Sequence, residues 1–170
     1  MSRFISFFLA GLGLAVLCVT AHSASPRPPA VMVYYHFNGQ GFIAGQPSGG
    51  GPFVAVAEHM RPVVLSGSAK IATVSLAPGK GAIAGICYFQ SSGGKLASSA
   101  AYAPCARMPL RIAGGEAGVS SVITDEHGYY VVVLDAGSYR IGAPPLFIEV
   151  RVEEGQTVLV PLRAGKRMVD

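Results

Sequence analysis

The stretch TDEHGYYVVVLDAGSYRI, residues 124–141, constrains the fold of this chain most, because apolar side chains occupy alternate positions along it. The apolar members of the alternation are Tyr130, Val132, Leu134, Tyr139 and Ile141. A period of two is typical of a strand with one buried face. Gly128 and Gly137 stand where tight turns favour positive φ, and the Asp125 side chain can cap the first turn. The segment therefore predicts strand, turn, strand, turn and strand within a small β-sandwich.

Short apolar runs and the same period of two recur along most of the chain. Strands are predicted for residues 31–37, 53–57, 62–65, 71–76, 83–89, 106–112, 119–124, 129–134, 139–141, 146–152 and 157–162. Pro109 cannot donate to a ladder, so it places its strand at an edge or at a bulge. The Gly-rich segment 39–51 predicts a mobile loop, and the small polar segment 91–104 predicts a surface loop. No segment after the N-terminal apolar run shows a helical period over about ten positions, so the predicted fold class is all-β.

The first residues have the pattern of a secretory signal peptide. Arg3 is followed by the apolar run Phe4–Val19 and then by small residues, so cleavage is expected after Ala21 or Ser23. A retained membrane anchor is one alternative, although the run is short for a span. Lipidation at Cys18 is another, although the residue before it is bulky. We therefore expect an exported protein of the periplasm, outer envelope or extracellular space, which meets the membrane only transiently through its signal.

Charged residues are sparse and dispersed. Once Arg3 leaves with the signal, twelve Lys and Arg stand against nine Asp and Glu, a formal net charge of +3. The basic residues form no run, so a nucleic-acid partner is not expected. Tryptophan is absent, which disfavours an aromatic platform for sugars. No cofactor is expected either.

Cys87 and Cys105 are the two cysteines that follow the signal. An even number in an exported chain predicts one disulfide, which would close a loop of about 18 residues and contribute roughly 3 kcal/mol. Two free buried thiols are the alternative. Strand parity turns Cys87 inward, whereas Cys105 precedes the next alternating run, so the bridge would join a strand face to a loop. Two cysteines without spaced histidines fall short of the four ligands of a structural metal site.

Three motifs follow one another in the second half of the chain. The first contains Gly81, Ile83 and Gly85, the second Thr124, Asp125, Gly128 and Tyr130, and the third Leu134, Gly137 and Tyr139. With these motifs residues 78–165 resemble the carboxypeptidase regulatory-like domain, which has a prealbumin-like (transthyretin-like) Greek-key β-sandwich of about seven strands. The resemblance implies structural turn and core roles for Asp125, Gly128, Tyr130, Gly137 and Tyr139. It also implies a non-catalytic accessory or adhesion module.

The chain departs from this family at two places. The family has a short link between its first two strands, where this chain has residues 91–104 and a predicted disulfide. Residues 31–76 match no family pattern and are expected to be a β-rich N-terminal segment, with an abbreviated β-unit as one interpretation. The expected organisation is a signal peptide at 1–23, a Pro-rich leader at 24–30, this segment, the sandwich at 77–166 and a tail at 167–170.

Candidate catalytic residues form no recognisable set. Three histidines follow the signal, His36, His59 and His127, and their spread along the sequence argues against a shared metal. Asp125, Glu126 and His127 form a polar cluster that a turn explains. One hydrolase has a transthyretin-like fold, but its C-terminal Y-R-G-S is absent here. We expect that the protein is not an enzyme, and a hydrolase is the least favoured alternative.

The candidate binding face is the aromatic segment Tyr34, Tyr35, His36 and Phe37. Alternation places its first and third residues on one side of a strand and its second and fourth on the other, and a strand buried on both sides is the alternative. We predict an exported, non-catalytic module for binding or assembly at the cell envelope, with an envelope protein or a glycan as partner and homo-oligomers as an option. The alternative function is an adhesin or pilus-like subunit that uses an exposed strand edge.

Overall fold

The computed structural model of the chain describes residues 31–57, 62–65, 72–73, 76–92, 102–115 and 118–168. Its strands are β1 Met32–Phe37, β2 Phe42–Ala44, β3 Phe53–Ala57, β4 Pro62–Leu65, β5 Ala72–Thr73, β6 Lys80–Ser92, β7 Tyr102–Pro104, β8 Pro109–Gly114, β9 Val119–Ile123, β10 Tyr129–Asp135, β11 Gly137–Ala143, β12 Leu146–Val152 and β13 Thr157–Met168. These ranges contain no helix long and apolar enough to cross a membrane. The predicted signal peptide, the Pro-rich leader and Cys18 lie outside the described residues. The predicted all-β class is confirmed.

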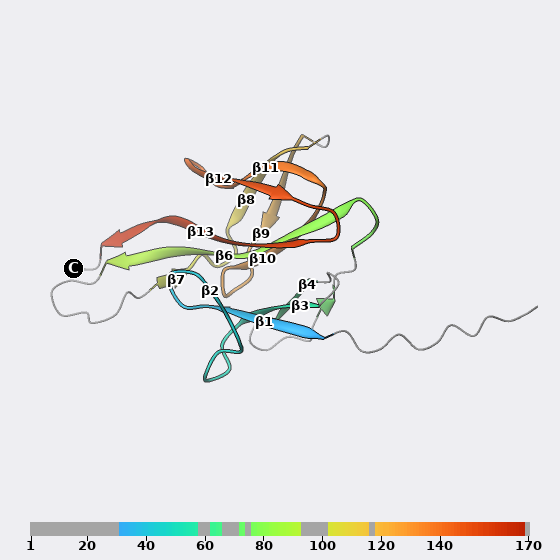
Figure 1. Ribbon diagram of the computed structural model, residues 1–170. Coiled ribbons are helices and arrows are strands. Elements are labelled where there is room, and N and C mark those ends of the chain that lie inside the picture. The colour runs from blue at the N-terminus through green and yellow to red at the C-terminus, as the bar shows by residue number, and fades with distance from the viewer. Residues whose placement is uncertain are drawn as a thin grey trace, which may run out of the picture.

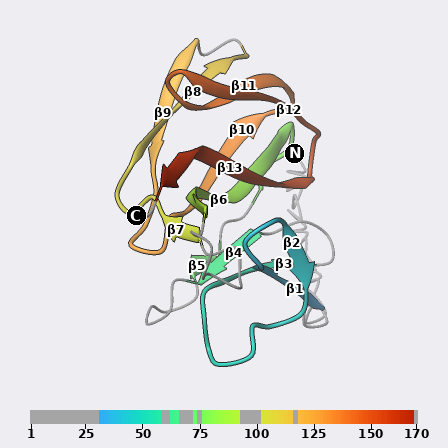
Figure 2. The same cartoon turned by 90° about the vertical axis from the view of Figure 1, so that its left-hand side faces the viewer.

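The strands form three sheets that stack as three layers (Figures 1 and 2). Sheet A has the strand order β2-β1-β3-β4-β5. Sheet B, in the middle, has the order β10-β6-β13, with β7 also paired to β6. Sheet C has the order β12-β11-β8-β9. Sheets B and C form the predicted β-sandwich, and sheet A covers the other side of sheet B.

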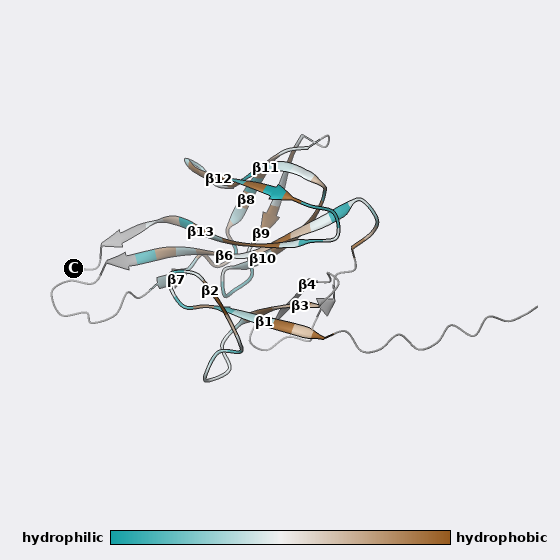
Figure 3. Ribbon diagram, viewed as in Figure 1, coloured by the Kyte–Doolittle hydropathy of each residue, from teal (hydrophilic) through white to brown (hydrophobic). Residues whose placement is uncertain are grey.

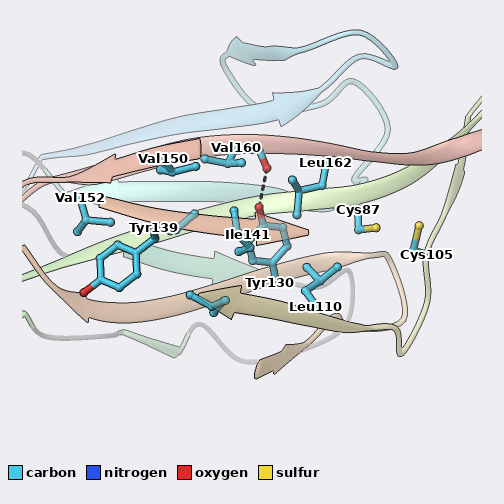
Figure 4. Close-up of a cluster of buried hydrophobic side chains, with 12 residues drawn as sticks. Cys87, Cys105, Leu110, Tyr130, Tyr139, Ile141, Val150, Val152, Val160 and Leu162 are labelled. Carbon is cyan, nitrogen blue, oxygen red and sulfur yellow. Dashed lines mark hydrogen bonds between the residues drawn. The ribbon is translucent and has the colours of Figure 1, made fainter. Parts of the chain in front are cut away.

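Alternate positions of sheets B and C build the core of the sandwich (Figure 4). Its buried residues are Ile83, Cys87, Cys105, Leu110, Ile112, Tyr130, Tyr139, Ile141, Val150, Val152, Val160 and Leu162. Along β11, Tyr139 and Ile141 are buried, whereas Ser138 and Arg140 are exposed. Along β11 the period of two is therefore the alternation between core and solvent, whereas along β10 the neighbours Tyr129 and Tyr130 face two different cores.

Strand β6 is buried on both faces. Residues 81–88 are all buried. Ile83 and Cys87 face the core shared with sheet C. Ala84, Ile86 and Tyr88 face a second core, which sheet A completes. The buried members of this second core are Phe37, Val54, Ala84, Ile86, Tyr88 and Tyr129. A nearly continuous apolar run is typical of a strand that is covered on both sides.

The first and last strands of the sandwich are neighbours. β13 pairs with β6 in parallel from Thr157 opposite Ala82 to Met168 opposite Ser92, with a bulge between Arg163 and Gly165. The other strand pairs in the described residues are antiparallel. The first strand of the sandwich, β6, therefore lies beside its last strand, β13.

Gly85 allows one tyrosine to reach across sheet B. Tyr130 of β10 and Val160 of β13 are the register partners of Gly85 on its two sides. The Tyr130 hydroxyl donates to the Val160 carbonyl at 2.9 Å (Figure 4). A Cβ atom at position 85 would lie 2.7 Å from the Tyr130 hydroxyl and would also overlap the Val160 oxygen. Close approach of the two neighbouring strands therefore requires glycine here.

Two segments predicted to be loops contain short strands. β2 lies within the Gly-rich segment 39–51 and pairs with β1. β7 lies within segment 91–104 and pairs with β6. A strand of three residues is too short to show a period, so neither could be recognised from an apolar pattern.

Three details around β8 and β11 also differ from the sequence-based expectation. Pro109 is the first residue of β8, which lies between β11 and β9, so the predicted edge position or bulge is wrong. The first position of a strand tolerates proline. Residues 106–108 belong to a turn region with Arg107 at φ 54°, and the predicted strand begins only after them. Gly128 has a φ of 78°, whereas Gly137 has no positive φ because it begins β11.

Candidate functional site

The acidic turn before β10 has a structural role. The Asp125 carboxylate accepts hydrogen bonds from the backbone N–H groups of His127 and Tyr129, both at 2.8 Å. The Glu126 carboxylate pairs with Arg107 at 2.6 Å, and both side chains are largely exposed. Backbone donors therefore occupy the Asp125 carboxylate and Arg107 pairs with the Glu126 carboxylate, so the turn explains the cluster.

The two cysteines lie side by side at one end of the sandwich core (Figure 4). The Cys105 backbone N–H donates to the Cys87 carbonyl at 2.9 Å. Both side chains are buried thiols in the structure, so the disulfide predicted from the sequence is not formed in it. A hydrogen bond between the thiols, together with burial, raises the pKa of Cys87, and the same hydrogen bond lowers the pKa of Cys105. Their proximity leaves the bridge as a prediction for the exported protein.

Strand β1 does not offer its aromatic segment as one binding face. Phe37 is only 5% exposed and packs against three aromatic rings between sheets A and B. Tyr34 packs edge to face on Phe53, with ring centroids 5.4 Å apart. The His36 Nδ1 atom lies 2.9 Å from the carbonyl oxygen of Gly45. Tyr35 is half-buried. Phe37 belongs to the core, so the four residues are not exposed together.

The described histidines do not come together. His36 lies on β1 in sheet A, and His127 lies in the turn between β9 and β10. His59 is outside the described residues. Within the part of the chain that the structure describes, no group of three or more His, Cys, Asp or Glu side chains is arranged to hold a metal ion.

A shallow hollow of about 570 Å³ lies on the outer face of sheet C. Ala113 and Ser138 contribute small side chains to it, and Arg140, Glu149 and Arg151 contribute long ones. The Arg140 guanidinium lies over the Phe147 ring, 5.4 Å from its centroid. The charges around the hollow are exposed and of both signs, so they favour no single chemical class of ligand.

The free edge of β9 has a clearer capacity to bind. Among the residues that the structure describes, β9 ends sheet C and pairs with β8 alone, so half of its backbone N–H and C=O groups point away from the sheet. Val122 packs against the sandwich core, whereas Val119, Ser121 and Ile123 are exposed on the outer face. Val119 is 72% exposed and Ile123 is 66% exposed, the highest values among the large apolar side chains in the described residues. Figure 2 shows β9 at the side of sheet C, and Figure 3 shows its hydrophobic end.

The other described edges have features that protect a strand from pairing with another chain. β2 and β5 have three and two residues, and β7 contains Pro104. β12 carries Glu149 and Arg151, and β13 contains Pro161 and a bulge. β10 is largely buried or half-buried, and it contacts β4 and β9. β9 has no charged residue, no proline and no bulge, so it is the least protected of the described edges.

One of the alternative functions expected from the sequence needs an exposed strand edge, but the sequence does not locate that edge. Residues 119–124 were expected to form a strand, and β9 covers Val119–Ile123. An uncharged strand is compatible with the middle or the edge of a sheet. Whether a strand lies at an edge depends on the order in which strands pair, and the periodicity within a single strand does not reveal that order.

No family model matches this chain. No curated protein matches it. Among solved structures, it is similar to a fimbrial protein from Bacteroides ovatus ATCC 8483, known from a crystal structure at 1.85 Å resolution, with a TM-score of 0.32 and 9% sequence identity. That match covers 69% of this chain and 27% of the fimbrial protein, so this chain corresponds to about a quarter of the length of that relative.

Proposed function

We propose that this chain is an exported, non-catalytic β-sandwich module of the cell envelope that assembles with a partner through the free edge of β9. One observation carries the proposal. β9 is an uncharged edge strand with two highly exposed aliphatic side chains, Val119 and Ile123. It corresponds to the adhesin- or pilus-like alternative expected from the sequence, with β9 as the contact strand.

The physical basis of the contact is strand addition. An extended segment placed beside β9 would pair with the outward row of N–H and C=O groups and extend sheet C by one strand. It would also cover one side of Val119 and Ile123, and apolar surface removed from water contributes about 25 cal/mol per Å². Hydrogen bonds to the backbone are insensitive to the partner's sequence, so the exposed side chains on the outer face would supply the selectivity.

Three other features support the assignment. The signal pattern of residues 1–23 would deliver the protein to the envelope. The sandwich of sheets B and C agrees with the carboxypeptidase regulatory-like architecture, and we propose membership of that family for residues 78–165. In the polar cluster before β10, two backbone N–H groups hold the Asp125 carboxylate, and Arg107 pairs with Glu126. These supports favour a module that binds over one that catalyses.

Site-specific photo-crosslinking in intact cells tests the proposal. A photoreactive phenylalanine analogue is placed at Ser121 of β9 or, as the matched control, at Ser138 of β11. Both serines are exposed on the outer face of sheet C, but β11 is an interior strand of that sheet. We expect a crosslinked product from position 121 and little from position 138. Equal crosslinking at the two positions, or none at position 121, would show that β9 is not the assembly contact.

A further inference from the structure

We infer that the partner strand is β9 of a second copy of the same chain, in an antiparallel pair centred on Ser121. This inference rests on the function proposed above, because it names the occupant of the same strand edge. It makes the assembly a two-fold symmetric dimer in which the two C sheets become one continuous sheet of eight strands. An isologous contact of this kind closes on itself.

The sequence of β9 is self-complementary about its centre. With Ser121 on the two-fold axis, Val119 of each copy lies opposite Ile123 of the other, and Ser120 lies opposite Val122. Directly opposite residues in an antiparallel pair have Cβ atoms about 4.5–5.5 Å apart, which brings each valine into contact with an isoleucine. The two most exposed of the large apolar side chains described would therefore cover each other twice in one dimer.

Charge does not oppose this pairing. β9 contains no charged residue, so no like charges meet across the axis. The nearest cation on the outer face beside the axis is Arg111 of β8, the register partner of Ser121. Three strand spacings would separate the two copies of Arg111, a distance of about 14 Å. This exceeds the screening length of about 8 Å at physiological ionic strength, so their repulsion is weak.

The neighbouring row of β8 favours the same contact. Pro109 lies opposite Ile123 and Ala113 lies opposite Val119, so the exposed aliphatic side chains have uncharged neighbours on their own sheet. The outer surface around the axis would then consist of two Val119–Ile123 pairs flanked by Pro109 and Ala113. Of the other large exposed aliphatic side chains, Ile43 on β2 and Ile148 on β12 lie on edge strands that are short or charged.

Cysteine crosslinking tests both the partner and the register. S121C should form a disulfide-linked dimer on mild oxidation, because opposite Cα atoms in an antiparallel pair are about 4.5–5.5 Å apart, within the range of a disulfide. V119C alone and I123C alone should not, since each would lie about 14 Å from its own copy. Mixing V119C with I123C should restore the crosslink. S138C, exposed on β11, controls for random collision, and all variants keep Cys87 and Cys105.

Solution measurements complete the test. Light scattering should find a dimer for the wild type, and V119K should raise the dimer dissociation constant about tenfold or more, because it replaces each Val119–Ile123 contact with a hydrated charge beside an isoleucine. I43K, an exposed change on β2, should leave the dimer intact, and thermal unfolding checks that both variants remain folded. A monomeric wild type, a crosslink for S121C no stronger than for S138C, or equal crosslinks for V119C alone and the mixture would overturn the inference.

The photo-crosslinking experiment separates this inference from the proposed function. A product from position 121 with twice the mass of the chain supports both statements. A product of any other mass supports assembly through β9 but overturns the second copy as its partner. No product at position 121 overturns both.

Discussion

The Tyr130 hydroxyl donates a hydrogen bond to the Val160 carbonyl oxygen at 2.9 Å. The two residues belong to β10 and β13, and Gly85 of β6 lies between them in the register of sheet B. Burial raises the pKa of Tyr130 well above the ordinary value for tyrosine, so the hydroxyl keeps the proton that it donates. One side chain therefore ties the three long strands of the central sheet together, at the level where β6 is covered on both faces.

Removing this hydroxyl should destabilise the protein. We expect Y130F to lower the free energy of unfolding by about 1 kcal/mol or somewhat more, since it deletes a buried hydrogen bond and keeps the ring. Urea denaturation of the purified protein measures the change. Y34F is the control, because the half-buried Tyr34 keeps its ring contact with Phe53 and should change stability by less than about 0.5 kcal/mol. Equal effects of the two variants would contradict the role of the Tyr130 bond.

Two glycines that the sequence motifs treat alike should respond differently to alanine. At position 85 a Cβ would lie 2.7 Å from the Tyr130 hydroxyl and would overlap the Val160 carbonyl, so G85A should cost about 1–3 kcal/mol or more. At position 137 the nearest atom would be 3.6 Å away and the backbone has no positive φ. G137A should therefore change the thermal midpoint little. A tolerated G85A would show that β6 and β13 can move apart at this point.

Two threonines offer a second matched pair. Thr124 is 2% exposed, and its hydroxyl donates to the Cys105 carbonyl and accepts from the Met108 N–H at 2.8 Å. T124V removes both bonds, so we expect a loss of about 1–3 kcal/mol. The Thr157 hydroxyl is buried with no hydrogen-bond partner among the described residues, so T157V should be neutral or stabilising. Chemical denaturation measures the change in the free energy of unfolding for each variant. A larger loss for T157V than for T124V would contradict the roles given to these hydroxyls.

Stability should fall at high pH because of a tyrosine between sheets A and B. Burial raises the pKa of Tyr129 to about 12, and its hydroxyl donates to the Pro52 carbonyl at 3.3 Å. In the unfolded chain tyrosine titrates near pH 10. The folded state therefore retains a proton that the unfolded state has lost, so the stabilisation is complete below about pH 10 and disappears as the pH rises towards about 12.

The test of this pH dependence compares the wild type with Y129F. The urea midpoint of Y129F should decline less steeply over that interval. Some decline should remain, because burial also raises the pKa values of Tyr102 and Tyr130. Parallel curves for the two proteins would show that Tyr129 does not titrate with the raised pKa.

The adjacent thiols of Cys87 and Cys105 predict a redox-dependent stability. Protein purified after export should have a mass about 2 Da below the reduced value, because an oxidising compartment would join the two sulfurs. Reduction should then cost about 3 kcal/mol, the expectation for a loop of about 18 residues. C105S should be insensitive to reductant and serves as the control. A measured mass equal to that of the reduced chain would mean that both cysteines remain thiols after export.

Most strands were predictable because each depends on local pattern alone. The alternation around Tyr130 and Tyr139 marks side chains that a sheet must bury on one face, and the structure buries both. The acidic turn was equally local, since Asp125 accepts hydrogen bonds from residues two and four positions ahead of it. The short strands β2 and β7 could not be predicted in this way, because three residues are held by their partner strands and not by a pattern of their own.

That this chain forms strands and turns, and where most of them lie, follows from local sequence, because a period of two marks the side chains that are removed from water. Which strands pair follows from the tertiary structure. In the structure β13 is parallel to β6, and separate sheets cover the two faces of β6. Pro109 is the first residue of an interior strand. β9 lies at the edge of sheet C. Pairing depends on contacts between residues far apart in the chain, and a backbone edge becomes available for binding only when that order leaves it without a neighbour.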